Sequence, residues 1–164
     1  ALVQPDDTRA QLKLGLSYEV GIETPTNLAA AADWYRTAAS KGDPLAQWSL
    51  GTLYLNGRGV VKDPAKAFEL ISLAAAQGIP GAQCDLGFCY SRGIGTSRDL
   101  AAAARLFRKA ADQGNASGQN NLGAALRDRH RRRRHPRVPQ PPCRRRAPYR
   151  GQPIRRPPRR TPEH

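Results

Sequence analysis

Two glycines separated by one residue form the pattern in this chain that comes closest to a chemical site. The stretch LGTLYLNGRGV, residues 50–60, holds Gly57 and Gly59, and the same arrangement recurs 36 residues later in LGFCYSRGIG. Glycines at this spacing let a backbone approach a phosphate group. A phosphate loop, however, places them after a strand and before a helix, whereas here they follow a helical pattern. We therefore interpret them as hinges of a repeated structural unit.

The other residues that could do chemistry do not form a catalytic constellation. All three His lie at positions 130, 135 and 164, so residues 1–128 contain no imidazole for acid–base work or metal binding. No Ser occupies a nucleophile elbow, and the Asp and Glu residues are spread as helix caps and surface charges. Asn115 and Ser117 match the sequence pattern of a glycosylation acceptor, but Asn115 is better explained as the cap of the last helix. We predict a non-enzymatic protein with no cofactor and no metal.

The cysteines do not indicate a disulfide framework. Cys84 and Cys89 lie five residues apart on one predicted helix. At a rise of ~1.5 Å per residue their Cα atoms are too far apart for a disulfide, which needs less than ~7 Å. We expect both to be small buried apolar residues. Cys143 stands alone near the C-terminus.

The hinge glycines belong to a pattern that repeats every 36 residues. A Leu-Gly pair recurs four times at this step, and tyrosines, Ala-Gln pairs, Ala-Ala pairs and further glycines recur in phase with it. A helix glycine has no Cβ, so it lets a neighbouring helix approach closely. We expect this role for the glycines of the four Leu-Gly pairs, which are Gly15, Gly51, Gly87 and Gly123.

Each repeat is predicted to contain two helices, which we call helix A and helix B. Capping residues stand at the expected N-termini, with Ile79 as the one poor cap. Gly42, Gly78 and Gly114 follow helix B, where a left-handed residue closes a helix. The predicted fold class is all-α, an α/α solenoid of two-helix repeats with a period of 36. Helix A is expected over residues 8–20, 44–56, 80–92 and 116–128, and helix B over 28–41, 64–77 and 100–113.

The repeat resembles a known family. The pattern A-Q-x-x-L-G-x-x-Y-x-x-G-x-G-V-x-x-D-x-x-K-A, present here as AQWSLGTLYLNGRGVVKDPAKA, is similar to the Sel1-like repeat (SLR), a relative of the tetratricopeptide repeat (TPR). The resemblance covers residues 7–128 as three full repeats and a fourth helix A. In the first copy Glu23 and Asn27 replace the second hinge Gly and the Asp. The resemblance implies a scaffold for protein–protein contacts, often in bacteria.

The binding surface is expected on the variable side of helix A. Projected at 100° per residue, one side of this helix carries the recurrent core residues and the other differs between copies. Stacked helix pairs expose that variable side along a concave groove, which we predict to bind a protein or peptide segment of unknown identity. Trp48 and Phe88 are the expected anchors, although either could instead fill a gap between repeats. The candidate binding residues are Trp48, Thr52, Asp85, Phe88 and Asn120.

The net charge of +14 resides almost entirely in the C-terminal segment. Residues 129–164 hold 14 Arg, 9 Pro and a single acid, Glu163, whereas the preceding residues are nearly balanced. Such a composition cannot bury a core, so we predict a disordered basic tail after an N-terminal stub (1–6) and the solenoid (7–128). The alternative function is therefore an electrostatic binder of nucleic acid or acidic lipid. The tail has only Tyr149 for base stacking, which favours the scaffold.

The basic tail begins at the position where the repeat predicts a fourth hinge. The positions in phase with Gly57 and Gly59 are Arg129 and Arg131. Because Arg, Pro and His are what GC-rich codons give when read out of frame, we predict that the tail derives from a reading-frame shift near residue 129 and is not a selected basic arm. The fourth helix A then lacks its helix B, which leaves Leu122 partly uncovered.

The sequence contains no segment that predicts membrane insertion. No run approaches the ~18 consecutive apolar residues of a transmembrane helix, and the N-terminal ALVQPDDTRA lacks the features of a signal peptide. The compartment stays open between bacterial cytoplasm and periplasm.

Overall fold

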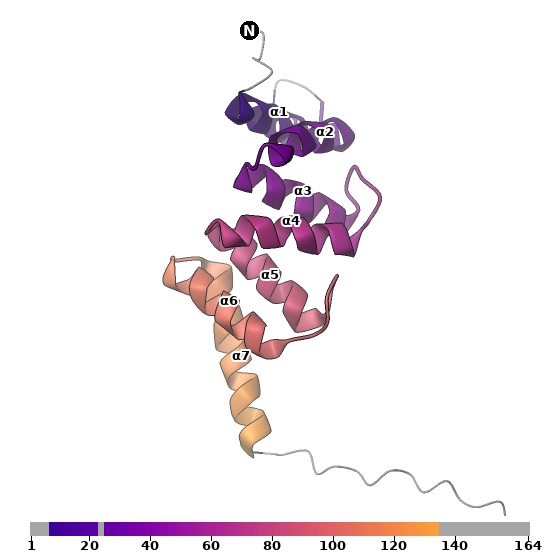
Figure 1. The fold of residues 1–164 in the computed structure, drawn as a ribbon. Coiled ribbons are helices and arrows are strands. Elements are labelled where there is room, and N and C mark those ends of the chain that lie inside the picture. The colour runs from indigo at the N-terminus through magenta and orange to yellow at the C-terminus, as the bar shows by residue number, and fades with distance from the viewer. Residues whose placement is uncertain (1–6, 23–24, 135–164) are drawn as a thin grey trace, which may run out of the picture.

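The computed structural model describes residues 7–22 and 25–134, and within these ranges all regular structure is helical. The helices stack pair after pair in chain order, from the indigo end of Figure 1 to the orange end. The predicted α/α solenoid is thereby confirmed. The helices are α1 (Thr8–Val20), α2 (Leu28–Ser40), α3 (Pro44–Asn56), α4 (Pro64–Ala76), α5 (Pro80–Arg92), α6 (Leu100–Asp112) and α7 (Ala116–Arg134).

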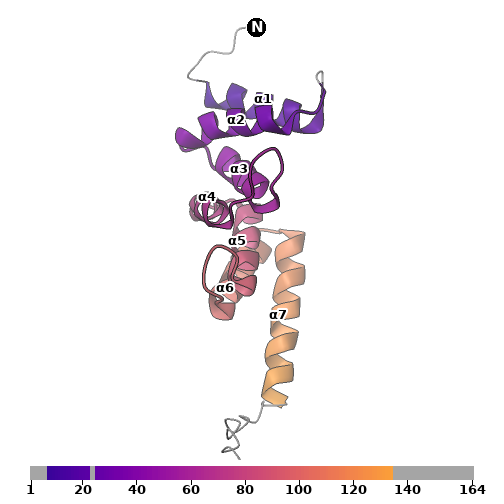
Figure 2. The same ribbon diagram turned by 90° about the vertical axis from the view of Figure 1, so that its right-hand side faces the viewer.

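Helix α7 differs from its predicted span. The first three A helices (α1, α3, α5) have the predicted bounds, and each B helix (α2, α4, α6) ends one residue earlier than predicted. In contrast, α7 runs six residues past its predicted end at 128 and projects beyond α6 (Figure 2). Arg129 stands where Gly57 and Gly93 end their helices, and arginine continues a helix readily. Residues 135–164 lie outside the described ranges, as do residues 1–6. The predicted disorder is wrong for residues 129–134, which continue α7, whereas disorder of residues 135–164 and the frame shift remain predictions.

The helix ends follow the predicted capping chemistry. The carboxylate of Asp43 accepts a hydrogen bond from the backbone N–H of Ala46 at 2.8 Å, which satisfies a donor that has no partner within the helix. Ile79 makes no such bond and is the poor cap of the series. The hinge glycines Gly57 and Gly59 have φ angles of 68° and 69°. Glycine adopts this left-handed conformation without the steric cost that a Cβ adds.

Helix A and helix B of one repeat pack through the glycine of the first three Leu-Gly pairs, whereas the prediction is wrong for Gly123, where a built Cβ would meet only Nη1 of Arg127 at 3.6 Å. A Cβ built on Gly51 would lie 2.7 Å from Cγ1 of Ile71, closer than real side-chain contacts allow. The absence of a side chain therefore permits the close packing of α3 on α4. The glycines and the helix B side chains that face them are Gly15 with Tyr35, Gly51 with Ile71, and Gly87 with Phe107.

Glutamines tie neighbouring helix pairs together. Gln47 Nε2 donates to the carbonyl of Ala39 at 3.5 Å, which is an end-of-helix acceptor on α2. Gln77 at the end of α4 donates in turn to Gln47 Oε1 at 2.9 Å. The next repeat has the same bond, from Gln113 to Gln83 at 2.8 Å.

None of the described helices is long and apolar enough to cross a bilayer.

Candidate binding surface

Trp48 lies in the junction between α3 and α5. Its ring packs on Gly81, where an added Cβ would overlap the indole, and its indole N–H donates to Asp85 Oδ2 at 2.7 Å. The side chain is half-buried. Of the two roles that the sequence leaves open, the geometry places Trp48 in a gap between repeats, and it shares that gap with Asp85.

Asp85 is the ionisable group of this junction. Burial raises the pKa of its carboxyl, and the hydrogen bond from Trp48 partly offsets that rise because it favours the charged form. The pair therefore joins two A helices through one hydrogen bond to a carboxylate with restricted solvent access. This is the geometry of a structural contact between two helices, in which the carboxylate of Asp85 is the polar group at one edge of the junction.

The next junction, between α5 and α7, uses the same two positions one repeat further on. Asn121 Nδ2 donates to Cys84 Sγ at 3.4 Å. Cys84 and Cys89 are both buried and free, as expected. Burial raises the pKa of the Cys89 thiol to about 11 and that of Cys84 as well. Neither thiol has the exposed, electropositive surroundings of a reactive cysteine.

Phe88 is the predicted anchor that remains accessible. Its side chain is 39% exposed, and the guanidinium of Arg92 lies over its ring, 5.7 Å from the centroid. Thr52 holds the equivalent position one repeat earlier, on α3, and donates to the carbonyl of Ser49 at 2.8 Å. Asn120 is exposed on α7, but its neighbour Asn121 is the residue that faces the groove described next.

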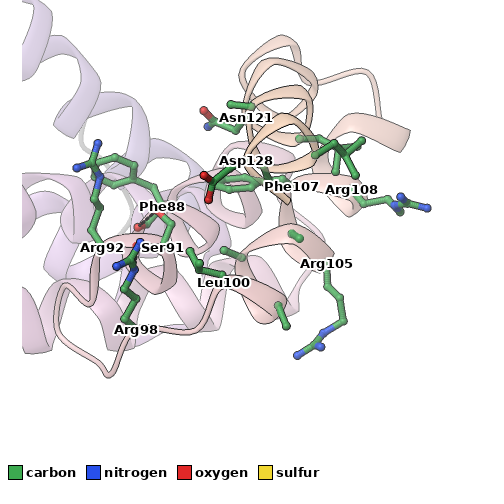
Figure 3. Close-up of a pocket in the computed structure, with 17 residues that line it drawn as sticks. Phe88, Ser91, Arg92, Arg98, Leu100, Arg105, Phe107, Arg108, Asn121 and Asp128 are labelled. Atoms are coloured by element: carbon green, nitrogen blue, oxygen red, sulfur yellow. Dashed lines mark hydrogen bonds between the residues drawn. The ribbon is translucent and has the colours of Figure 1, made fainter. Parts of the chain in front are cut away.

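A groove lies between α6 and α7 and extends to Phe88 on α5 (Figure 3). We call it the end groove, and it has a volume of about 1360 Å³. Most of its surface is apolar, because alanines of α6 and α7 line it together with larger side chains. The larger apolar side chains are Phe88, Leu100, Phe107, Leu122 and Leu126.

The charged side chains of the end groove are mostly basic. Four arginines line it, against one acid, Asp128 on α7. Arg98 Nε donates to the carbonyl of Ser91 at 3.0 Å, which holds the loop between α5 and α6 against the end of α5. Figure 3 shows Arg92 beside Phe88 at one end of the groove and Arg105 and Arg108 at the other. The end groove is thus an apolar trough with a positive rim.

Comparison with known proteins identifies the repeat. The family model described as Sel1 repeat matches residues 8–43, 44–79 and 80–115. The chain belongs to the Sel1 repeat family. The solved structures that resemble it include two Sel1 repeat proteins. No curated protein matches it.

The first of these structures is c5321, a protective antigen present in uropathogenic Escherichia coli strains, which displays an SLR fold. It is 42% identical, with a TM-score of 0.69, and the match covers 71% of this chain and 25% of that one. The second, a Sel1 repeat protein from Oxalobacter formigenes, is 30% identical with a TM-score of 0.68, over 72% of this chain and 49% of that one. This chain therefore spans half or less of the length of either Sel1 protein.

The α6 side of the end groove was missed by the sequence analysis, which placed the Sel1 binding face on helix A alone. Leu100, Ala104, Arg105 and Arg108 all come from helix B of the third repeat. A signal for the groove was present in the sequence, because the fourth hinge lacks its glycines.

Within the described residues, no group of three or more His, Cys, Asp or Glu is placed to hold a metal ion.

Proposed function

We propose that this Sel1 array binds a segment of another protein in the end groove and along the adjoining variable faces of α3, α5 and α7. Sel1 repeat proteins are in general protein-interaction scaffolds and typically do not catalyse reactions. The finer statement concerns where this chain binds and through which residues. We propose likewise that it has no enzymatic activity of its own.

The observation that carries the proposal is an exposed aromatic ring at the edge of an apolar trough. Binding sites are concave, mostly apolar and marked by a few polar groups, and aromatic side chains carry much of the energy of an interface. Phe88 combines a 39% exposed ring with a position at the edge of the end groove. Leu126, 42% exposed on α7, adds a second apolar side chain there.

The remaining predicted residues take different roles in this proposal. Thr52 and Asn120 flank the anchor on α3 and α7 and contribute hydrogen bonds to the partner. Trp48 and Asp85 contribute indirectly, because their mutual hydrogen bond holds the two helices that carry the binding surface, α3 and α5, at a fixed spacing. Phe88 is then the contact whose loss weakens the complex most.

Affinity capture with the full chain and matched variants tests the proposal. A partner captured from a nuclease-treated bacterial lysate is identified, purified and titrated against each variant. We expect Phe88→Ala to weaken binding by about 2 kcal/mol, about 30-fold, without changing the melting temperature. Trp48→Ala should lower the melting temperature, because it removes packing on Gly81 and leaves Asp85 without its donor.

The control is Leu73→Ala, because Leu73 is an exposed apolar residue of α4 that does not line the end groove. It should bind the partner as the wild type does. A partner that binds Phe88→Ala and the wild type equally would overturn the proposal. The alternative, binding of nucleic acid or acidic lipid through residues 129–164, stays a prediction, since most of those residues lie outside the described ranges.

A further inference from the structure

The end groove occupies a place that is filled in the preceding repeat. There, the hinge after α5 lies on the start of α4, so closely that a Cβ on Gly95 would overlap the carbonyl oxygen of Pro64. Beside it, the rings of Phe68 and Tyr90 pack edge to face with centroids 5.4 Å apart. Hinge and aromatic pair together close the junction between α4 and α5.

The same positions one repeat later leave the space open. Leu100 replaces Pro64, Ala104 replaces Phe68, and Leu126 replaces Tyr90. Position 131, in phase with the hinge glycine Gly95, lies inside α7 and makes no hinge. Leu100 is 41% exposed and Leu126 is 42% exposed as a result. The groove is therefore a repeat junction whose covering segment is missing from the described residues.

The charges around this junction also change along the array. In α2 the position of Arg105 is held by Asp33, which forms an ion pair with Arg36. Hydrogen bonds from Arg36 to Tyr54 and to Asp33 raise the pKa of its guanidinium. In α6 the equivalent positions are Arg105 and Arg108, so the acid is replaced by a second base. Two like charges one helical turn apart repel each other unless an anion lies between them.

We propose that the end groove binds an acidic segment of a partner protein. Large apolar side chains of that segment fill the space over Leu100, Ala104 and Leu126, and its carboxylates contact Arg105 and Arg108. Arginine clusters recognise acidic motifs through charge-assisted, often bidentate hydrogen bonds. The inference rests on the proposed function, because it names the chemistry of the partner that occupies the same groove.

Charge argues against the chain's own C-terminal segment as the occupant. Residues 129–164 carry the same sign of charge as the rim, with Glu163 as their one acid. Nucleic acid would satisfy the arginines, but its bases bind by stacking on exposed aromatic rings, and of the two aromatic residues that line the groove Phe107 is buried, which leaves Phe88 alone for stacking. An acidic segment with apolar side chains satisfies both.

Selection from a phage-displayed library of random twelve-residue peptides tests the inference. The full chain serves as bait, and the double variant Phe88→Ala/Leu126→Ala is used to remove peptides that do not depend on the groove, because this variant leaves the charge of the groove unchanged. The C-terminal segment is identical in both baits, so acidic peptides that bind it are subtracted. Peptides that remain should be rich in Asp and Glu together with Leu or Phe.

A synthetic copy of a selected peptide is then titrated by fluorescence anisotropy. We expect the double charge reversal Arg105→Glu/Arg108→Glu to weaken binding at least about tenfold and added salt to weaken it further. The matched control is Arg9→Glu/Lys13→Glu, which makes the same change of charge on exposed residues of α1. It should bind as the wild type does, and both double variants should keep the helical circular dichroism spectrum.

Other results would overturn the inference, and they separate it from the proposed function. If selected peptides depend on Phe88 and Leu126 but are neutral or basic, the acidic partner is wrong and protein binding in the groove stands. If no peptide remains after the subtraction, both fail. If the protein sediments as a dimer that Leu126→Asp dissociates, a second copy occupies the groove and the inference is wrong.

Discussion

Helices α2 and α6 begin with the same five residues, LAAAA, yet these residues have different surroundings. Ala32 in α2 is 1% exposed, whereas its equivalent in α6, Ala104, is half-buried and lines the end groove. The hinge after α3 lies on the start of α2, whereas the position equivalent to Gly59 two repeats later lies inside α7 and makes no hinge over the start of α6. Burial of a helix B in this array therefore depends on the following repeat as well as on the helix's own sequence.

The largest effect is expected where the hinge covers α2. Gly59→Ala requires an alanine at a φ of 69° and places its Cβ against the backbone carbonyl of Leu28. Conformational strain and steric overlap together should lower the free energy of unfolding by roughly 3 kcal/mol or more. Gly42→Ala is the control, since Gly42 has a φ of 89° but no atom within 4 Å of a built Cβ. Urea denaturation giving equal losses for both variants would show that the hinge does not press on α2.

The second test places the same substitution at the covered and the uncovered position. Ala32→Phe should cost about 1–3 kcal/mol, because the added ring has no space in a packed core. Ala104→Phe should be tolerated, since the new ring can enter the end groove. The ring of Phe68 fills the equivalent space in the preceding repeat, where it packs on Tyr90. Thermal denaturation followed by circular dichroism measures both. Equal destabilisation would mean that the groove closes in solution.

The third test uses the glycines of the Leu-Gly pairs. A Cβ on Gly123 would meet only Nη1 of Arg127, at 3.6 Å, because no described helix B packs on α7 there. Gly123→Ala should therefore stabilise the protein by about 0.5–1 kcal/mol through helix propensity. Gly51→Ala should destabilise it, because the methyl group meets Ile71. A loss of stability in Gly123→Ala would indicate that another segment packs on this face of α7.

The smallest effect concerns pH and the junction between α3 and α5. Burial raises the pKa of Asp85 in the folded state, so the folded protein holds this proton more tightly than the unfolded chain, where the pKa is about 3.9. The contribution of Asp85 to stability therefore falls as pH rises from about 4 through the raised folded value. Asp85→Asn should gain stability relative to the wild type as pH increases toward 7. A difference that is constant between pH 4 and pH 7 would contradict this.

The periodicity of the sequence was sufficient to predict the helix pairs, because most helix ends carry a local signal in a capping residue or a left-handed glycine, and α5, which follows the poor cap Ile79, begins with Pro80. The end of α7 was not predicted, since the loss of the hinge glycine at position 129 removes a stop signal without marking a new one. Trp48 and Phe88 look alike on a helical projection. They differ because Gly81 of the next repeat makes room for the indole, and a projection of one helix contains no information on its neighbour.

The side-chain hydrogen bonds between A helices link residues 37 positions apart, from Trp48 to Asp85 and from Asn121 to Cys84. Helices pack mainly on their neighbours in sequence, so each contact closes only a short loop and costs little chain entropy. During translation, α1, α2 and α3 can fold together while α6 is still inside the ribosome. Synthesis from the N-terminus then completes the end groove after helices α1 to α5, which support it, have formed.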